Sequence, residues 1–384
     1  MKKKLAILGS TGSIGSILLS LINKKKFEIV ILSANKNYKK ILLQANLFNV
    51  KNIIINDQTS FLKAIDINKN KKIRIFNKNY DLKKIIKKKI DYTMSSITGI
   101  DGLKPTFEII KFTKKIAIAN KESIICGWNL INKELHKNNT KFIPVDSEHF
   151  SIWYALRNNL NKNIDKIYLT ASGGSLLNVK KKQFNKLKIN DILKHPNWNM
   201  GKKITIDSST LMNKVFEVIE AKNIFNLEYK KIKIIIHPQS FIHALIQFSD
   251  GMLKIIAHET TMDIPIRNTI YNNQTKYFKY KNLNFNKLNN AKFIKVDTNK
   301  YPYVKIINKL PKISSLYETV LVTANDEYVR QFLEKKIKYS DIINKTLKII
   351  NRKEFIKLKK ILPRNISDVI TTSKIVKDKI KSIN

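Results

Sequence analysis

The strongest constraint on the fold is a glycine-rich turn near the amino terminus. The apolar run 5–8 leads directly into Gly9, Gly12 and Gly15, and the amphipathic stretch 14–22 follows. A strand, a glycine turn and a helix in this order are typical of a dinucleotide site, because glycines let the backbone approach a pyrophosphate at the helix amino terminus. The alternative is an ordinary turn between a strand and a helix. The amides expected to face the anion belong to Thr11, Gly12, Ser13 and Ile14.

The same alternation continues through the first 146 residues. Continuously apolar runs rich in Ile and Val predict strands that are buried on both faces of a parallel sheet. We therefore predict an α/β chain whose first domain, 1–146, is a Rossmann-like doubly wound parallel sheet that binds NADPH. The expected strands are 4–8, 27–33, 52–55, 73–76, 91–95, 115–119 and 142–145, and the expected helices include 14–22, 38–48, 81–88 and 102–112.

The character of the chain changes after residue 146. Dense polar motifs indicate that 147–270 is a separate central region, which the resemblance described below implies to be an α+β catalytic and dimerisation domain with a flap. Residues 271–300 are rich in Asn, Lys and Tyr without periodicity, which is typical of a linker. Residues 301–384 are almost wholly helix-like and predict a C-terminal helical bundle. Its expected helices are 304–310, 316–332, 339–350 and 367–380.

The chain is strongly basic, with 73 Lys and Arg against 29 Asp and Glu, a formal net charge of +44. A nucleic-acid or membrane partner is one interpretation. However, only six of these residues are Arg, and the lysines are spread over the whole chain, as A+T-rich coding favours. No apolar run approaches the roughly 18 residues of a membrane span, and the single Cys126 excludes an internal disulfide. We expect a cytoplasmic protein without nucleic-acid or membrane partners.

The end of the second strand bears on the choice of dinucleotide. NAD sites place an acidic residue there to accept from the ribose 2′-hydroxyl. This chain has Asn35, Lys36 and Asn37 instead. A lysine suits the 2′-phosphate of NADP(H), so that cofactor is favoured over NAD(H). The alternative is that Lys36 is one of many solvated lysines.

Two stretches combine carboxylates with hydroxyl groups. Asp146 and Glu148 flank Ser147 directly after an expected strand, which suits a hard cation such as Mg²⁺ or Mn²⁺ but equally suits helix capping. In the second stretch Ser208 or Ser209 is expected to cap a helix that carries Asn213 and Lys214, a pattern suited to a phosphate monoester. Glu217 then lies one turn further along. The alternative is a Lys214–Glu217 ion pair on a solvated helix face.

Three further segments carry polar groups of the kinds found in binding sites. Ser172 lies in a small-residue loop, 171–175, after the expected strand 167–170. The stretch 195–201 mixes His195, Trp198 and turn-forming residues, which is typical of a lid over a ligand. His237 and His243 are expected in or near the apolar strand 234–236 and in a helix after it, where a single histidine is more often structural.

Taken together, these motifs resemble those of the 1-deoxy-D-xylulose 5-phosphate reductoisomerases. They occur in the same order as in that family and extend across most of the chain. The matching stretches are ILGSTGSIG, ANKES (119–123), PVDSEH (144–149), SGG (172–174), HPNWNMGKKITIDSSTLMNK (195–214), IEA (219–221) and IHPQSFIHALI (236–246). The resemblance implies conversion of this phosphorylated ketose to 2-C-methyl-D-erythritol 4-phosphate with NADPH and Mg²⁺, Mn²⁺ or Co²⁺. It also implies a homodimer.

The resemblance further implies a role for individual residues. Asp146, Glu148 and Glu217 would hold the metal. The phosphate would contact Ser172, Ser208, Asn213 and Lys214, with His195 nearby. The rest of the substrate would contact Lys121, Ser147, Asn197 and Trp198, and Met200 would join Trp198 in the flap. NADPH would be lined by Thr11 to Ile14, Asn35, Lys36, Asn37, Asn120, Glu122 and Gly201. His243 would lie near the active site, and the catalytic set would be Lys121, Asp146, Glu148, Glu217 and His243.

Some positions depart from the family pattern. Val215 replaces a usual glycine, Ser175 a usual proline and Asn35 a usual glycine, which bears on the affinity for phosphate and cofactor. The nearest enzyme rival, a semialdehyde or homoserine-type dehydrogenase, shares the glycine loop. A semialdehyde dehydrogenase needs a nucleophilic cysteine, but Cys126 lies in an apolar run that is typical of packing. The other rival, a basic nucleic-acid-binding protein, leaves the placed carboxylates unexplained.

Overall fold

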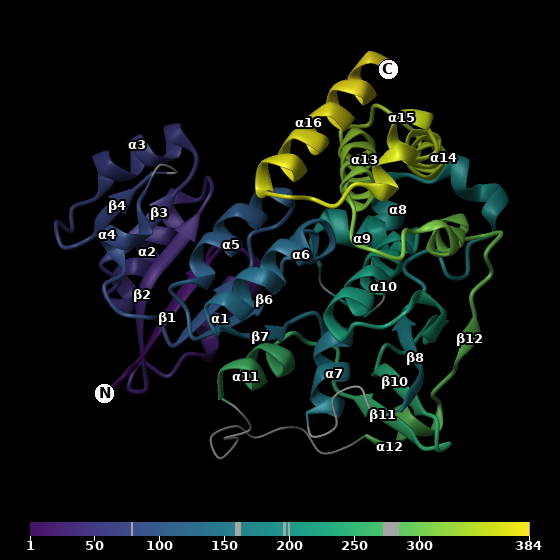
Figure 1. The fold of residues 1–384 in the computed structure, drawn as a ribbon, viewed down its shortest axis with the longest axis horizontal. Helices are drawn as coiled ribbons and strands as arrows, with labels where there is room; N and C mark the ends of the chain where they lie inside the picture. The colour runs from purple at the N-terminus through teal and green to yellow at the C-terminus, as the bar shows by residue number, and fades with distance from the viewer. Residues whose placement is uncertain (78–79, 158–162, 195–196, 199, 272–283, 384) are drawn as a thin grey trace. The chain divides into compact units, whose positions relative to one another are not determined.

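A computed structural model describes residues 1–77, 80–157, 163–194, 197–198, 200–271 and 284–383. The described residues divide into two compact units (Figure 1). The first takes in Met1–Ser123, Leu130–Asp146 and the described part of Met262–Phe278. The second takes in Ile124–Asn129, Ser147–Thr261 and the described part of Lys279–Asn384.

The first unit is built on a parallel sheet of seven strands in the order β4-β3-β2-β1-β5-β6-β7. Its central strands are apolar and enclosed on both faces; Leu5, Ala6 and Ile7 have no exposed surface. This confirms the predicted doubly wound sheet. The strands are β1 (Lys3–Leu8), β2 (Phe27–Ala34), β3 (Asn52–Ile55), β4 (Arg74–Phe76), β5 (Tyr92–Ser95), β6 (Lys115–Ile118) and β7 (Lys141–Pro144).

Helices connect these parallel strands, as crossover connections require. One more helix comes from a distant part of the chain: α11 packs beside α1, and its Tyr271 hydroxyl donates to the carbonyl of Leu21 at 2.8 Å. The helices of the unit are α1 (Ser13–Leu21), α2 (Tyr38–Phe48), α3 (Gln58–Ile67), α4 (Leu82–Ile85), α5 (Leu103–Ile110), α6 (Lys121–Lys137), whose residues 124–129 fall in the second unit, and α11 (Asp263–Tyr271).

The strand order places the glycine turn at the centre of the sheet. From β1 the chain proceeds outward through β2, β3 and β4 on one side, and through β5, β6 and β7 on the other. The carboxyl ends of β1 and β5 therefore flank the point where the strand order reverses. Ligands of doubly wound sheets bind at this crevice.

The second unit has a mixed sheet of five strands in the order β11-β10-β8-β9-β12. Strands β8 and β9 are parallel, whereas β10 pairs antiparallel with both β8 and β11. Apolar side chains of α7, α10 and this sheet form its core, among them Ile152, Leu169, Val218 and Phe225. The strands are β8 (Ile164–Ala171), β9 (Ile232–Ile236), β10 (Ile242–Phe248), β11 (Leu253–Ala257) and β12 (Ile294–Lys295).

The helices of this unit fall into an inner set, which Figure 1 draws from blue-teal to green, and a C-terminal set, drawn from yellow-green to yellow. The expected helix 304–310 forms as a 3-10 helix, Pro302–Lys309. None of the described helices has the length and apolar character that a bilayer crossing needs. The inner set is α7 (Ser147–Leu156), α8 (Ile189–Leu193), α9 (Lys202–Ser209), α10 (Met212–Phe225) and α12 (Phe285–Asn289); the C-terminal set is α13 (Leu316–Leu333), α14 (Tyr339–Ile350), α15 (Lys353–Ile356) and α16 (Ile366–Ile383).

Two sequence expectations about this unit are wrong. Ser208 and Ser209 do not cap a following helix, because they form the last turn of α9; Leu211 then adopts φ 60°, and α10 begins at Met212. Tertiary contacts explain the helix, since buried Asp207 accepts a 2.7 Å hydrogen bond from Asn325 of α13. His243 lies on strand β10 and not on a helix, because pairing with β8 and β11 fixes this segment as the middle of a sheet.

Candidate functional site

The turn after β1 has room only for glycine at two of its three glycine positions. Gly9 has φ +83°, and a Cβ there would lie 2.7 Å from the carbonyl oxygen of Ser96. At Gly15 a Cβ would lie 2.5 Å from the Gly9 oxygen. The turn is therefore pressed against the chain after β5 and against its own first residues. This close packing is the local reason for the glycine spacing.

The helix after this turn starts with uncapped amides, except that the Gly12 amide donates to the Gly9 oxygen at 3.1 Å. Helix α1 begins without a side-chain cap at Gly12, and the first amides of any helix lack intrahelical acceptors. Gly12 and Ser13 are exposed, and Thr11 and Ile14 are half-buried. An uncapped, accessible helix start of this kind suits a phosphate group. The structure thus brings together all four residues predicted for the pyrophosphate.

The residues after β2 are exposed. Asn35, Lys36 and Asn37 follow the strand directly, and the Asn37 side chain accepts a hydrogen bond from the Lys40 amide at 3.2 Å, so it caps α2. Asn35, a departure from the family pattern, has a freely exposed side chain. No acidic residue occurs between Ala34 and Lys40.

Asn120 and Glu122 follow β6 and hold the segment after β5. The Asn120 side chain caps α6, accepts from the Ser123 amide at 2.7 Å and donates to the Gly99 carbonyl at 2.9 Å. Glu122 accepts from the Gly99 amide at 3.3 Å. Both side chains are buried. The two residues therefore lie at the same edge of the sheet as the glycine turn.

Lys121 and Asp146 form an ion pair in the first unit. The ammonium lies 2.7 Å from Asp146 Oδ2, and the side chains are 11% and 20% exposed. Lys121 begins α6, and Asp146 follows β7, the neighbouring strand. The carboxyl ends of two adjacent parallel strands thus place the cation beside the carboxylate.

In the second unit, helices α7 and α10 bring two carboxylates to one lysine. Lys214 Nζ lies 2.6 Å from Glu148 Oε1 and 2.6 Å from Glu217 Oε2. The Lys214 and Glu217 side chains are only 6% and 1% exposed, so the alternative of a solvated surface pair is contradicted. Burial alone would lower the pKa of Lys214, but the two carboxylates outweigh it and raise that pKa.

These carboxylates belong to a larger oxygen cluster. Asp146 directly precedes α7, and its carboxylate, with those of Glu148 and Glu217, offers oxygens that lie within 4.8 Å of one another. Ser147 Oγ donates to Glu148 Oε2 at 2.6 Å, and Asn213 Nδ2 donates to Glu217 Oε1 at 2.5 Å. Oxygen donors at this spacing fit a hard divalent cation such as Mg²⁺.

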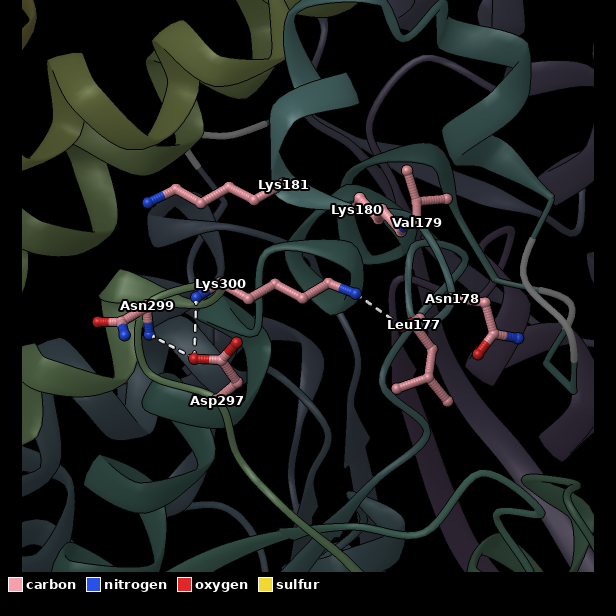
Figure 2. A pocket seen from close by; sticks show the side chains of 8 residues that line it. All are labelled: Leu177, Asn178, Val179, Lys180, Lys181, Asp297, Asn299 and Lys300. Atoms are coloured by element: carbon pink, nitrogen blue, oxygen red, sulfur yellow. Dashed lines mark hydrogen bonds between the residues drawn. The ribbon is translucent and has the colours of Figure 1, made fainter.

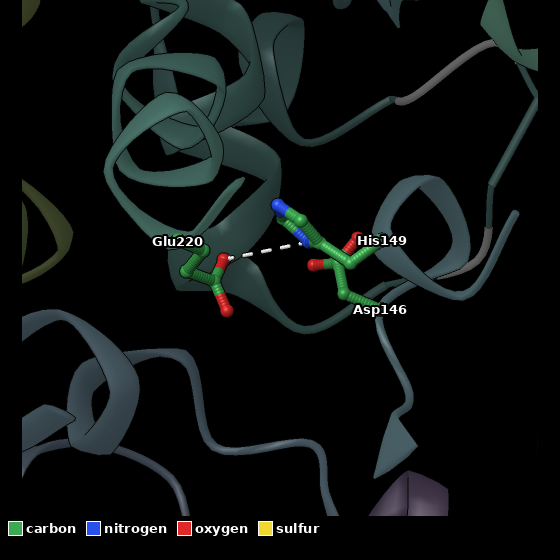
Figure 3. A group of neighbouring side chains, drawn as sticks. All are labelled: Asp146, His149 and Glu220. Carbon is green, nitrogen blue, oxygen red and sulfur yellow. Dashed lines mark ion pairs between the residues drawn. The ribbon is translucent and has the colours of Figure 1, made fainter. Parts of the chain in front are cut away.

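A second group shares Asp146 with the first and adds His149 and Glu220 (Figure 3). His149 Nδ1 lies 3.9 Å from Glu220 Oε2, and both side chains are buried. The other ring nitrogen, Nε2, lies 2.9 Å from the backbone oxygen of Glu217. His149 therefore connects α7 to the part of α10 that carries a cluster carboxylate.

The small-residue loop after β8 packs against the end of α9. Gly174 has φ +66°, and a Cβ there would lie 2.7 Å from Cα of Ser209 and 2.9 Å from the Ser208 oxygen. Ser172 Oγ accepts from the Gly174 amide at 3.0 Å. The structure thus brings the loop of Ser172 to Ser208, although the two are far apart in the sequence. Ser175, a departure from the family pattern, donates to the Ile192 oxygen at 2.8 Å.

In the predicted lid segment, Trp198 contacts β10 and Asn197 contacts the residues before β10. Trp198 packs edge-on against His243 with ring centroids 6.1 Å apart, and His243 stacks on His258 at 3.7 Å. Burial and the neighbouring His258 lower the pKa of His243 well below its usual value. Asn197 donates to the Pro238 oxygen at 2.6 Å. His195 lies outside the described residues. Gly201 precedes α9 and is exposed, and a Cβ added there would have no heavy atom within 4 Å.

A cavity of about 410 Å³ lies elsewhere in the second unit (Figure 2). Lys300 spans it and donates to the Leu177 oxygen at 2.6 Å, while Asp297 accepts from the backbone amides of Asn299 and Lys300. Its other lining residues are Asn178, Val179, Lys180 and Lys181. None of them was predicted as a site residue, and the cavity is distinct from the carboxylate cluster.

Sequence reasoning missed four side chains near these sites. His149 follows Asp146 by three residues, and Glu220 follows Glu217 by three, so helical spacing was the available signal. Lys40 and Gln44 of α2 contact the glycine turn through hydrogen bonds at 2.8–3.0 Å. No pattern in the sequence indicates these two contacts, because they join separate elements.

Comparison with known proteins gives consistent matches along the chain. A model of the 1-deoxy-D-xylulose 5-phosphate reductoisomerase family matches residues 5–127, and models of its C-terminal domains match 142–225 and 258–379. The reductoisomerase of Pelagibacter ubique is 54% identical over 386 residues, with both chains fully covered. That of Clostridium novyi is 37% identical, with 99% of each chain covered.

Solved structures agree. A crystal structure of the reductoisomerase in complex with NADPH, fosmidomycin and magnesium has a TM-score of 0.90 at 28% identity, covering 99% of this chain and 98% of the other. The Zymomonas mobilis enzyme in complex with NADPH has a TM-score of 0.87 at 27% identity, covering 100% and 99%. The glycine turn, the carboxylate cluster and these full-length matches lead to one conclusion: the chain belongs to the 1-deoxy-D-xylulose 5-phosphate reductoisomerase family.

Proposed function

We propose that this protein converts 1-deoxy-D-xylulose 5-phosphate to 2-C-methyl-D-erythritol 4-phosphate with NADPH and a divalent cation, a step of isoprenoid precursor synthesis. The observation that carries the proposal is the group of Glu148, Glu217 and Lys214 beside Asp146, in which Glu217 and Lys214 are almost fully buried. Glu148 is 14% exposed and Asp146 20%, and enclosing carboxylates to this degree is costly unless cations compensate them. A site that needs cations and offers a lysine suits a substrate with a carbonyl and a phosphate.

Asp146, Glu148 and Glu217 would hold Mg²⁺, Mn²⁺ or Co²⁺. Their donor atoms are all oxygens, and the three side chains converge within 4.8 Å, which fits a hard cation. When bound there, the ion supplies Lewis acidity that polarises the substrate carbonyl and stabilises developing negative charge on oxygen. Ser147, Asn213 and His149 keep the carboxylates in place through contacts with Glu148, Glu217 and the backbone of α10.

The phosphate would lie among Ser172, Ser208, Asn213 and Lys214. Helix α10 supplies the amide and the ammonium, and the close packing of the 172–174 loop on α9 brings the two hydroxyl-bearing segments together. A lysine is a point charge that pairs well with phosphate oxygens. His195 is assigned to the same subsite from the family resemblance.

The remaining roles follow the family assignment. Lys121 and Ser147 would contact the substrate hydroxyl groups, and Asn197 and Trp198 would cover them. His243, whose pKa is lowered by burial, remains neutral near pH 7 and can hydrogen-bond without adding charge. NADPH would bind the glycine turn through Thr11, Gly12, Ser13 and Ile14, with Asn35, Lys36 and Asn37 at the 2′-phosphate. Asn120, Glu122 and Gly201 would complete its site.

The protein is also proposed to act as a cytoplasmic homodimer. Strand β11 is an edge strand of the second sheet, and its Leu253 and Ile255 side chains are each 48% exposed, with the preceding Met252 66% exposed. An exposed apolar edge strand is a liability that natural proteins cover. A second copy of the chain against this edge would cover it. Size-exclusion chromatography with light scattering distinguishes one copy from two.

The direct test of the activity is NADPH oxidation, followed at 340 nm, with purified protein, 1-deoxy-D-xylulose 5-phosphate and Mn²⁺ or Mg²⁺. We expect turnover that stops with a chelator and returns when the cation is restored in excess. Ribulose 5-phosphate, which has the same five-carbon chain and phosphate but carries a hydroxyl on C1 and the opposite configuration at C3, serves as the substrate control. Folded protein that fails to oxidise NADPH with both cations present would overturn the proposal.

A further inference from the structure

Helix α2 contacts the glycine turn with two side chains that are one helical turn apart. Lys40 and Gln44 are separated by four residues and so lie on one face of the helix. Both reach from the second βα unit of the sheet to the turn after β1. Neither contact is needed to close α2 itself, whose start is capped by Asn37.

Gln44 and Ser10 form a reciprocal pair. Gln44 Nε2 donates to the Ser10 carbonyl at 3.0 Å, and Ser10 Oγ donates to Gln44 Oε1 at 2.8 Å. Both residues are buried, at 8% and 0% exposure. Hydrogen bonds in such a site are well shielded from competing water, so the pair fixes the direction of the Ser10 carbonyl.

Lys40 holds the next carbonyl. Its Nζ donates to the Thr11 oxygen at 2.9 Å and to Ser16 Oγ at 2.8 Å, and so joins the turn to the first full turn of α1. No carboxylate pairs with this ammonium in the part of the chain that the structure describes. Its positive charge therefore adds to that of the α1 amino terminus.

These contacts set the direction of the turn's amides. In a trans peptide the carbonyl and the following N–H point in opposite directions. Holding the Ser10 carbonyl toward Gln44 turns the Thr11 N–H away from α2. Holding the Thr11 carbonyl toward Lys40 fixes the next peptide, whose Gly12 N–H closes the turn by donating to the Gly9 oxygen at 3.1 Å.

We propose that Lys40 and Gln44 are positioning residues for the cofactor pyrophosphate, which clamp the glycine turn and so fix the direction of the Thr11 amide before NADPH arrives. The inference rests on the proposed function, since it assumes that the turn binds NADPH. The clamp acts on a part that NADPH and NADH share. It therefore changes the affinity for both, whereas Lys36 is assigned to the 2′-phosphate that only NADPH carries.

The test measures NADPH and NADH dissociation constants by fluorescence on the full-length protein. K40M is expected to raise both dissociation constants about tenfold, which corresponds to the loss of roughly one charge-assisted hydrogen bond. K40R, which keeps charge and donors, should stay within about threefold of wild type. K39M removes an exposed neighbouring lysine of α2 and should change neither. Q44M, in which the new side chain has a similar volume, should raise both dissociation constants several-fold.

The kinetic readout separates positioning from loss of structure. K40M should raise KM for NADPH while kcat stays within about twofold, because uniform binding is lost. A merely structural role would lower kcat and the melting temperature together. If K40M binds both cofactors as K39M does, or weakens NADPH alone, the clamp is overturned. If wild-type protein itself fails to bind NADPH, the proposed function fails and the clamp with it.

Discussion

The glycine turn of the first unit and the cluster of Glu148, Lys214 and Glu217 in the second use different chemical groups. The turn offers backbone amides at an accessible helix start that no side chain caps. The cluster offers ionised side chains in the interior, with Lys214 and Glu217 almost fully buried. A binding site formed by backbone amides tolerates many side-chain substitutions, as long as they leave the backbone conformation unchanged. A site of buried charges depends on each member, because removing one leaves its partner uncompensated.

The largest effect is expected from Glu217→Gln, which keeps the shape of the side chain but removes its charge. Turnover should fall by about 10³-fold or more, since a cation ligand and a partner of Lys214 are lost together. NADPH affinity should change little, because the turn belongs to the other unit. The exposed Glu228, 68% exposed and paired with Lys230, gives the matched control E228Q. Steady-state kinetics decide, and an unchanged kcat removes Glu217 from the metal set.

A smaller effect is expected from Lys214→Ala. KM for the phosphorylated substrate should rise by roughly 10- to 100-fold, as loss of a charged phosphate contact implies. The variant also leaves Glu148 and Glu217 unpaired, so its melting temperature should fall. Lys230→Ala removes a 73% exposed lysine and should leave both quantities unchanged. A KM shift below a few-fold, with the variant folded, argues against the phosphate role. It would also show that the cluster, like the glycine turn, tolerates the loss of a single side chain.

The smallest effect is expected from Gly12→Ala, which probes the backbone site. Gly12 has φ −73°, and a Cβ would meet only the Gly9 oxygen at 3.4 Å, so the melting temperature should barely change. The added methyl group stands where the pyrophosphate approaches, so NADPH affinity should fall several-fold. Fluorescence titration beside thermal unfolding checks both expectations. Unchanged affinity would show that the cofactor does not approach the turn at this residue.

Much of the first unit could be predicted from the sequence. Strands β1, β2 and β3 lie within one residue of their predicted bounds, because strands enclosed on both faces require continuous apolar runs that are visible in the sequence. The glycine turn was predictable because the residue type records a local backbone requirement: Gly9 and Gly15 have no space for a Cβ. In both cases the residue types at the positions themselves carry the signal, although the space at Gly9 is closed by Ser96 from a distant part of the chain.

The second unit was harder to predict. The sequence indicated no helix over 202–209, because Asp207 and its polar neighbours are unfavourable in an isolated helix interior; buried partners such as Asn325 stabilise them. His243 was placed on a helix, although pairing with two neighbouring strands makes its segment β10. Strand identity there depends on long-range pairing, which local periodicity does not record.

The sequence alone was sufficient to predict the doubly wound sheet, the glycine turn and the family, since these follow from local apolar patterning and from long specific strings. Only the tertiary structure decided that Lys214 is a buried cation between Glu148 and Glu217 and not half of a solvated pair. Only it showed that Lys40 and Gln44 reach the glycine turn. The physical reason is the same for both: burial and contact between separate elements are set by packing at long sequence separation, and no single segment encodes them.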